Sequence, residues 1–353
     1  MMGQPGFFDL QHRYEGLDAK SDPLVAILAA VPFELFRIKL KTALVKGGLR
    51  RSEADRKSAA GRKPWDEVLI FKALVLQALY NLSDDQMEYQ LRDRLSFMRF
   101  VGLGLEDAVP DAKTLWLYRE ALAKAGAVEG LFDLFDSYLK AQGYIAMGGQ
   151  IIDATIVPAP RQRNSRDDNA AVKSGKTPAE WEEKPAKNRQ KDKDARWTKK
   201  HGRSHFGYKN HISIDRRHKL VRRYAVSSAS VHDSQKLEDV LDGDNTASGV
   251  WADSAYRSAE TEAKLATRAM KSHIHRRGSR NKPLTPRQEA ANKTRSKVRA
   301  RVEHVFGNQH VAMGGKFVRT IGIVRATVKI GMQNLAYNMR RLVVLERNAF
   351  AGG

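Results

Sequence analysis

The hydrophobic period of the sequence changes near residue 148, and this change constrains the fold more than any other feature. From residue 23 to about 142 the apolar residues recur at helical spacing, as in WDEVLIFKALVLQALYN, which is apolar on all sides. The stretch QIIDATIVPAP then alternates as a β-strand does, with Asp153 among apolar neighbours. The sequence therefore predicts an all-helical region at 1–145 and an α/β region at 146–348.

The helical region contains recognisable helix start signals. Ser83 and Gln86 have the spacing of a capping box, and Asp111 precedes the next apolar helix as an N-cap. Several short helices of this kind can form a helix-turn-helix unit in which PDAKTLWLYREALAK reads DNA. The alternative is plain core packing, because such arrangements are also common without DNA. We expect region 1–145 to serve DNA binding and dimerisation.

The α/β region begins with the strand that contains Asp153, and further elements follow in a regular order. FGYKNHISIDRRHKLVRRYAVSSAS reads as a hairpin with its turn at DRRHK. The predicted elements after it are a helix start HDSQKLEDVL, a strand GVWAD, a helix SAETEAKLATRA, a strand MKSHIH, and a helix that starts at Thr285 and runs through VRARVEHVFGNQ. This order of strands and helices resembles an RNase H-like α/β fold.

The stretch 158–206 interrupts this order and differs from it in character. It mixes Pro, Asn, Lys, Arg and Asp without an apolar period, and it contains Trp181 and Trp197. A segment that buries so little apolar surface does not fold easily by itself. The sequence therefore predicts a long basic loop insertion whose backbone becomes ordered chiefly on a polyanionic partner.

Positive charge is concentrated in two segments. The chain has 62 Lys and Arg against 40 Asp and Glu, a net charge of +22. Residues 161–223 carry a net +12 and residues 268–301 a net +11, so the rest of the chain is close to neutral. Dense local positive charge favours a polyanion, because neutralised phosphates release their counterions. The alternative is a basic surface that serves solubility or binds another anionic partner.

Three carboxylates stand where the predicted fold brings side chains to one end of its sheet. Asp153 lies on the first strand, Asp253 at the tip of the strand GVWAD, and Glu303 on the last helix. Three such charges repel unless cations neutralise them, which predicts two Mg²⁺ or Mn²⁺ ions and displacement at a phosphodiester. Taken singly, Asp253 could open a turn, and Glu303 could pair with Arg299 on the helix surface.

The motifs IIDATIV, VHDS, WADSAY and RARVEHVFG, in this order, resemble those of the bacterial DDE transposases of insertion sequences, in particular the insertion-sequence-five group. The resemblance covers residues from about 45 to 345. It implies that the three carboxylates Asp153, Asp253 and Glu303 form a metal-binding catalytic triad and that Arg299 supports phosphate or DNA-end binding. The chain has Ser296 and His310 where the broader group has Tyr and Lys.

The resemblance also implies the partners: double-stranded DNA, both at terminal inverted repeats and at the target, bound by a homodimer or a higher oligomer. We expect four basic residues to lie along the DNA path, namely Lys199, Lys200, Arg203 and Lys209. Two alternatives remain, which are a basic DNA-binding protein without catalytic activity and an RNase H-like nuclease without strand transfer.

The sequence also predicts where the protein resides. The chain has no cysteine, no apolar run of about 20 residues and no signal-peptide pattern at its N-terminus. We therefore expect a cytoplasmic protein, and the resemblance implies that it is bacterial and associated with the nucleoid.

Overall fold

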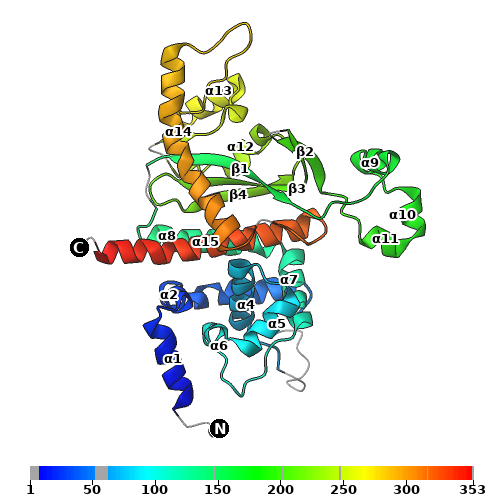
Figure 1. Cartoon of the computed structure of the whole chain (residues 1–353), viewed down its shortest axis with the longest axis vertical. Helices are drawn as coiled ribbons and strands as arrows, with labels where there is room; N and C mark the ends of the chain where they lie inside the picture. The colour runs from blue at the N-terminus through cyan, green and yellow to red at the C-terminus, as the bar shows by residue number, and fades with distance from the viewer. Residues whose placement is uncertain are drawn as a thin grey trace. The chain divides into compact units, whose positions relative to one another are not determined.

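The computed structural model describes most of the chain, and the chain divides into two compact units (Figure 1). Unit 1 comprises Met1–Tyr138 and Leu335–Gly353, and unit 2 comprises Leu139–Asn334. The residues described are 8–51, 63–145, 148–200, 202–245, 248–315 and 317–351. Within these ranges no helix is both long enough and apolar enough to cross a membrane.

Unit 2 is built on a mixed sheet of six strands. The strands are β1 (Gln150–Pro158), β2 (Arg196–Lys200), β3 (Arg203–Asp215), β4 (Val221–Ser228), β5 (Gly249–Trp251) and β6 (Lys271–Ser272). The order is β2-β3-β1-β5-β6, and β4 also pairs with β3. β1 and β4 run antiparallel to β3, whereas β1, β5 and β6 run parallel to one another. This topology is RNase H-like, as the sequence predicted.

The helices of unit 2 connect these strands in the predicted order. They are the 3-10 helix η2 (Asp233–Lys236), α12 (Leu237–Val240), the 3-10 helix η3 (Ser254–Tyr256), α13 (Ala259–Thr267), α14 (Pro286–Gly307) and the π-helical turn η4 (Asn308–Ala312). α14 begins at the predicted capping box, in which Thr285 and Gln288 bond to each other's backbone amides. The strand predicted at 270–275 is shorter, with two residues in β6.

β1 is the central strand of the sheet, and its burial explains its apolar sequence. Ile152 belongs to an apolar cluster with Val250 of β5 and Ile274, whereas Val157 belongs to a second cluster with Phe206 of β3. A strand between two neighbours and covered on both faces needs apolar residues on both faces. Asp153 therefore interrupts an otherwise apolar strand in the middle of the sheet.

The structure corrects the prediction of an irregular loop at 158–206. This insertion contains α9 (Arg166–Lys173), α10 (Ala179–Glu183), α11 (Pro185–Arg189) and β2. Trp181 is 0% exposed, and the carboxylate of Asp192 accepts hydrogen bonds from the hydroxyl of Tyr208 at 2.8 and 2.7 Å. The insertion is held by a few buried side chains and not by a continuous apolar face. Its helices are also short, so the sequence shows no apolar periodicity.

Unit 1 is helical, as predicted. Its elements are α1 (Asp9–Ala19), α2 (Pro23–Ala30), the 3-10 helix η1 (Phe33–Phe36), α3 (Arg37–Lys46), α4 (Glu67–Tyr80), α5 (Asp84–Asp93), α6 (Leu95–Val101), α7 (Ala112–Ala125), most of α8 (Ala127–Ala141) and the later part of α15 (Ile323–Ala351). Ser83 and Gln86 form the predicted capping box of α5, and Asp111 caps α7. α4 is buried on nearly all sides, in agreement with its apolar sequence.

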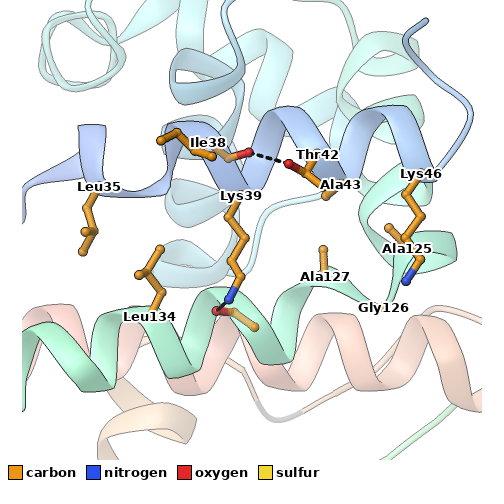
Figure 2. A pocket seen from close by; sticks show the side chains of 11 residues that line it. Leu35, Ile38, Lys39, Thr42, Ala43, Lys46, Ala125, Gly126, Ala127 and Leu134 are labelled. Carbon is orange, nitrogen blue, oxygen red and sulfur yellow. Dashed lines mark hydrogen bonds between the residues drawn. The ribbon is translucent and has the colours of Figure 1, made fainter. Parts of the chain in front are cut away.

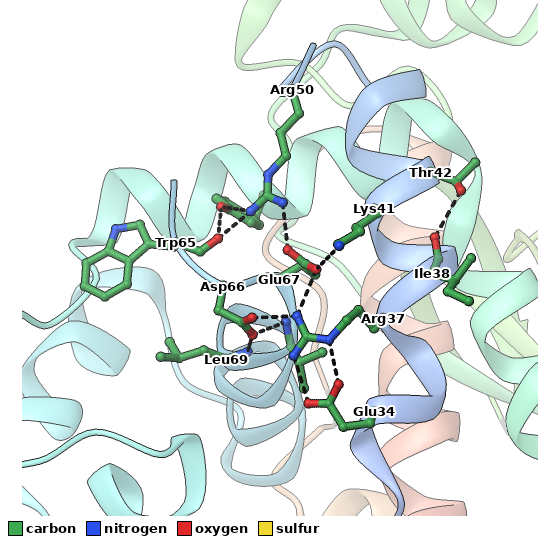
Figure 3. Close-up of polar contacts among 12 residues, drawn as sticks. Glu34, Arg37, Ile38, Lys41, Thr42, Arg50, Trp65, Asp66, Glu67 and Leu69 are labelled. Carbon is green, nitrogen blue, oxygen red and sulfur yellow. Dashed lines mark hydrogen bonds and ion pairs between the residues drawn. The ribbon is translucent and has the colours of Figure 1, made fainter. Parts of the chain in front are cut away.

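A buried carboxylate ties three segments of unit 1 together (Figure 3). Glu67, only 4% exposed, accepts hydrogen bonds from Arg37 at 2.9 Å and from Arg50 at 2.7 Å. Arg50 also donates to the carbonyl of Trp65 and to the hydroxyl of Tyr118. Burial by itself would raise the pKa of Glu67, but the hydrogen bonds from Arg50 and Arg37 outweigh it and hold this pKa below its ordinary value.

We predict that Glu67→Gln lowers the free energy of unfolding of unit 1 by about 3 kcal/mol, because it removes the buried counter-charge of Arg50 and one of the carboxylates that surround Arg37. Glu34→Gln is the matched control: Glu34 also pairs with Arg37 but is exposed, so its loss costs below about 1 kcal/mol. Urea denaturation of both variants at neutral pH measures the difference. Equal losses for the two variants would contradict the assignment of Glu67 as the buried centre of this network.

Candidate active site

Asp153 is held in place by both of its carboxylate oxygens. Its Oδ1 accepts a hydrogen bond from the backbone amide of Ala154 at 2.8 Å, and its Oδ2 accepts one from Nη1 of Arg299 at 2.7 Å. Burial raises the pKa of Asp153, the positive charge of Arg299 opposes this rise, and the negative charge of Asp253 adds to it. Asp153 is thus a mostly buried carboxylate, 16% exposed, on which the charge of a second carboxylate acts.

Asp253 lies at the same end of the sheet as Asp153. The parallel register pairs Ile151 of β1 with Trp251 of β5, so each aspartate stands two residues beyond a paired residue. Burial by itself would raise the pKa of Asp253, but the hydrogen bond from Ser254 and the charge of Arg299 outweigh it and lower this pKa. Asp253 is therefore held ionised beside Asp153.

Glu303 lies on α14, the helix that packs against β1 and β5. Val302 and Val305 are fully buried, but Glu303, which lies between them in the sequence, is exposed. Arg299, one turn earlier, contacts Asp153. The structure therefore brings together Asp153, Asp253 and Arg299, and within its described ranges no three Asp, Glu or His side chains are close enough to hold a metal ion.

Two further side chains belong to this end of the sheet, and sequence reasoning did not assign them to it. Tyr256 is buried, its hydroxyl has no hydrogen-bond partner among the described residues, and its pKa is raised first by burial and then by Asp233, Asp153 and Asp253. Burial and the charge of Arg299 lower the pKa of His275, against the opposing charge of Asp253. The motif WADSAY already contained Tyr256, but only the fold brings it to the carboxylates.

The predicted DNA-contact residues fall into two groups. Lys199, Lys200 and Arg203 are exposed where β2 meets β3, and Lys200 is close enough to lower the pKa of Asp153 against the effect of burial. Lys209 is different, because its amine donates to the carbonyl of Val231 at 2.8 Å and to Asp233 at 2.7 Å. Its side chain is 13% exposed, so Lys209 is occupied by an internal ion pair.

Unit 1 contains a pocket of about 520 Å³ between α3 and α8 (Figure 2). Leu35, Ile38 and Leu134 contribute apolar walls, and Lys39 reaches across to the carbonyl of Gly130 at 2.8 Å. The pocket contains no carboxylate or histidine. It therefore lacks the carboxylate and imidazole ligands that most metal sites in proteins use.

Comparisons with known proteins match regions in both units of the chain. The family model described as a transposase DDE domain matches residues 146–339, which is more than half of the chain, and a second model, described as a transposase domain, matches residues 12–121. A cryo-EM structure of a piggyBac transposase synaptic complex with hairpin DNA is similar at a TM-score of 0.45 and 13% sequence identity, over 94% of this chain and 76% of that chain. The extent of the first match shows that the chain belongs to the family of transposases with a DDE domain.

Proposed function

We propose that this transposase cuts DNA at the ends of its insertion sequence and joins the freed 3′ hydroxyls to target DNA by metal-dependent transesterification. The observation that supports this most strongly is the parallel register of β1 and β5, which puts Asp153 and Asp253 at one end of an RNase H-like sheet. No covalent enzyme–DNA intermediate is required, because the 3′ hydroxyl attacks the phosphodiester directly.

The carboxylates fit two Mg²⁺ or Mn²⁺ ions in their chemistry. Carboxylate oxygens are the ligands that these hard cations prefer, and Oδ2 of Asp153 already binds a positive group, the guanidinium of Arg299. We assign Asp153, Asp253 and Glu303 as the ligands, with Glu303 turning inward from its exposed position. Bound cations supply charge stabilisation for the attacking and leaving oxygens of the displacement.

The chain's own residues hold the DNA around this site. Lys199, Lys200 and Arg203 are exposed cations that suit the phosphates of double-stranded DNA, and Arg299 suits a phosphate close to the reacting bond. We propose that terminal repeats and target DNA both use this path, in a homodimer or a higher oligomer.

We further propose that unit 1 recognises the terminal repeats through α7. Six residues of this helix are buried, but Lys113 is exposed and Trp116 is 43% exposed near its N-terminus. The N-terminal residues of a recognition helix are those that contact base edges in a helix-turn-helix. The part of PDAKTLWLYREALAK that reads bases is therefore its first two turns.

Strand transfer tests the proposed reaction. Purified protein with Mg²⁺, labelled element ends and a target plasmid is expected to yield joined products, which a denaturing gel resolves. Cleavage without joining would point instead to an RNase H-like nuclease. Binding without either reaction would point to a DNA-binding protein whose catalytic centre is inactive.

We predict that Asp153→Asn, Asp253→Asn and Glu303→Gln each reduce cleavage and joining by at least about 1,000-fold, because each removes one ligand charge from the metal site. Binding of a labelled DNA end, measured by fluorescence anisotropy, should stay within about threefold of the wild-type value, since the basic contacts remain. A variant with near-normal turnover would remove that residue from the catalytic triad.

We predict that the triple variant Lys199→Gln, Lys200→Gln and Arg203→Gln weakens binding to specific and random DNA by similar factors. Each lost phosphate contact should lower the log–log salt slope by about 0.9. Lys209→Met is the matched control. Lys209 forms an ion pair with Asp233, so this substitution should leave the salt slope unchanged. Anisotropy titrations at several salt concentrations measure both, and an unchanged slope in the triple variant would exclude these residues from the DNA path.

A further inference from the structure

The guanidinium of Arg299 is positioned by one carboxylate. Its side chain is 23% exposed, and its Nη1 donates to Oδ2 of Asp153 at 2.7 Å. The Nε atom is buried and has no hydrogen-bond partner among the described residues. Both oxygens of Asp153 thus have a donor, one from the backbone of Ala154 and one from Arg299.

The ion pair of Arg299 with Asp153 compensates negative charge at this site. Asp153 is mostly buried in a central strand, and the charge of Asp253 acts on it, so its ionised form is costly without a cation nearby. Arg299 acts on both carboxylates, since its charge opposes the raised pKa of Asp153 and lowers that of Asp253. A divalent cation at these carboxylates would supply the same compensation.

Arg299 and a divalent cation therefore compete for one place. A cation that binds Oδ2 of Asp153 would lie against the guanidinium, which is 2.7 Å from this oxygen and repels the cation. The two arrangements exclude each other by charge, although the backbone bond from Ala154 can remain in both.

We propose that Arg299 is the built-in counter-ion of the metal site: it neutralises Asp153 in the metal-free protein and must leave Oδ2 for a divalent cation to bind there. This inference rests on the proposed assignment of Asp153 and Asp253 as metal ligands. Its consequence is that Arg299 lowers the affinity of the site for cations, and that metal binding frees its guanidinium beside the carboxylates.

The test is Mn²⁺ binding to the metal-free full-length protein, measured by isothermal titration calorimetry without DNA. Arg299→Gln removes the competing charge, so the dissociation constant for Mn²⁺ should fall by about tenfold or more. Arg299→Lys keeps a positive charge at the single contact and should stay within about threefold of the wild-type value. An Arg299→Gln constant equal to that of the wild-type protein would overturn the inference.

Arg301→Gln is the matched control. Arg301 is an exposed residue of the same helix that donates to the carbonyl of Arg216 at 2.8 Å, so its loss changes the net charge equally without touching Asp153. We expect less than a threefold change in the dissociation constant, because salt screens charges at a distance. An equal gain in affinity for Arg301→Gln and Arg299→Gln would also overturn the inference, since it would reflect net charge alone.

Asp253→Asn separates this inference from the proposed function. The Mn²⁺ binding heat that Asp253→Asn loses is assigned to the carboxylate site. The Arg299 variants are compared by this part of the binding heat alone. If Asp253→Asn loses no signal, the proposed metal site is wrong and the inference falls with it. If the signal is lost but Arg299→Gln leaves the affinity unchanged, only the inference is wrong.

Thermal unfolding gives a second readout. Without its counter-ion the buried Asp153 destabilises the fold, so Arg299→Gln should melt below the wild-type protein in chelator, and added Mn²⁺ should raise its melting temperature by more than that of the wild type. Should Arg299→Gln fail to fold, Arg299→Met, which keeps an apolar stem, takes its place. Equal Mn²⁺ shifts in variant and wild type would contradict the inference.

Discussion

The parallel pairing of β1 with β5 is the constraint on which the rest of unit 2 depends. It joins Ile151 to Trp251 and so aligns two chain segments that are 100 residues apart. Because the strands are parallel, the residues that follow the pairing emerge at the same end of the sheet. Asp153 and Asp253 consequently lie close enough for their charges to interact. Two ionised carboxylates in a partly buried position carry an electrostatic cost.

This electrostatic cost explains why positive or hydrogen-bonding side chains surround the two aspartates. Arg299 contacts Asp153, Lys200 lies close enough to act on it, and Ser254 donates to Asp253. Sites that bind cations or charged substrates commonly retain such locally unfavourable charge, which the rest of the fold must offset. In this protein the apolar clusters on both faces of β1 provide the offset.

The two basic segments seen in the sequence have different structural origins. One contains the folded insertion, in which Trp181 and the pair of Asp192 with Tyr208 supply a small core, and the other contains most of α14. Part of the excess charge is thus carried on helices and strands of unit 2.

Much of the architecture could be predicted because its signals are local. The caps at Ser83, Asp111 and Thr285 mark helix starts through bonds within four residues, and they are present as predicted. The insertion was predicted wrongly because its helices are held by single buried anchors, Trp181 above all. A single buried side chain that contacts residues distant in the sequence produces no hydrophobic periodicity.

The sequence by itself determined the order of strands and helices, and with it the positions of Asp153 within the first strand and of Asp253 just after a later strand, because strand alternation follows from local pattern. Only the tertiary structure decided which charges meet. It placed Arg299 against Asp153, 146 residues away, left Glu303 exposed, and paired Lys209 with Asp233. Such pairings depend on how side chains of separate elements share a small volume and compensate one another's charge, and spacing along the chain does not encode them.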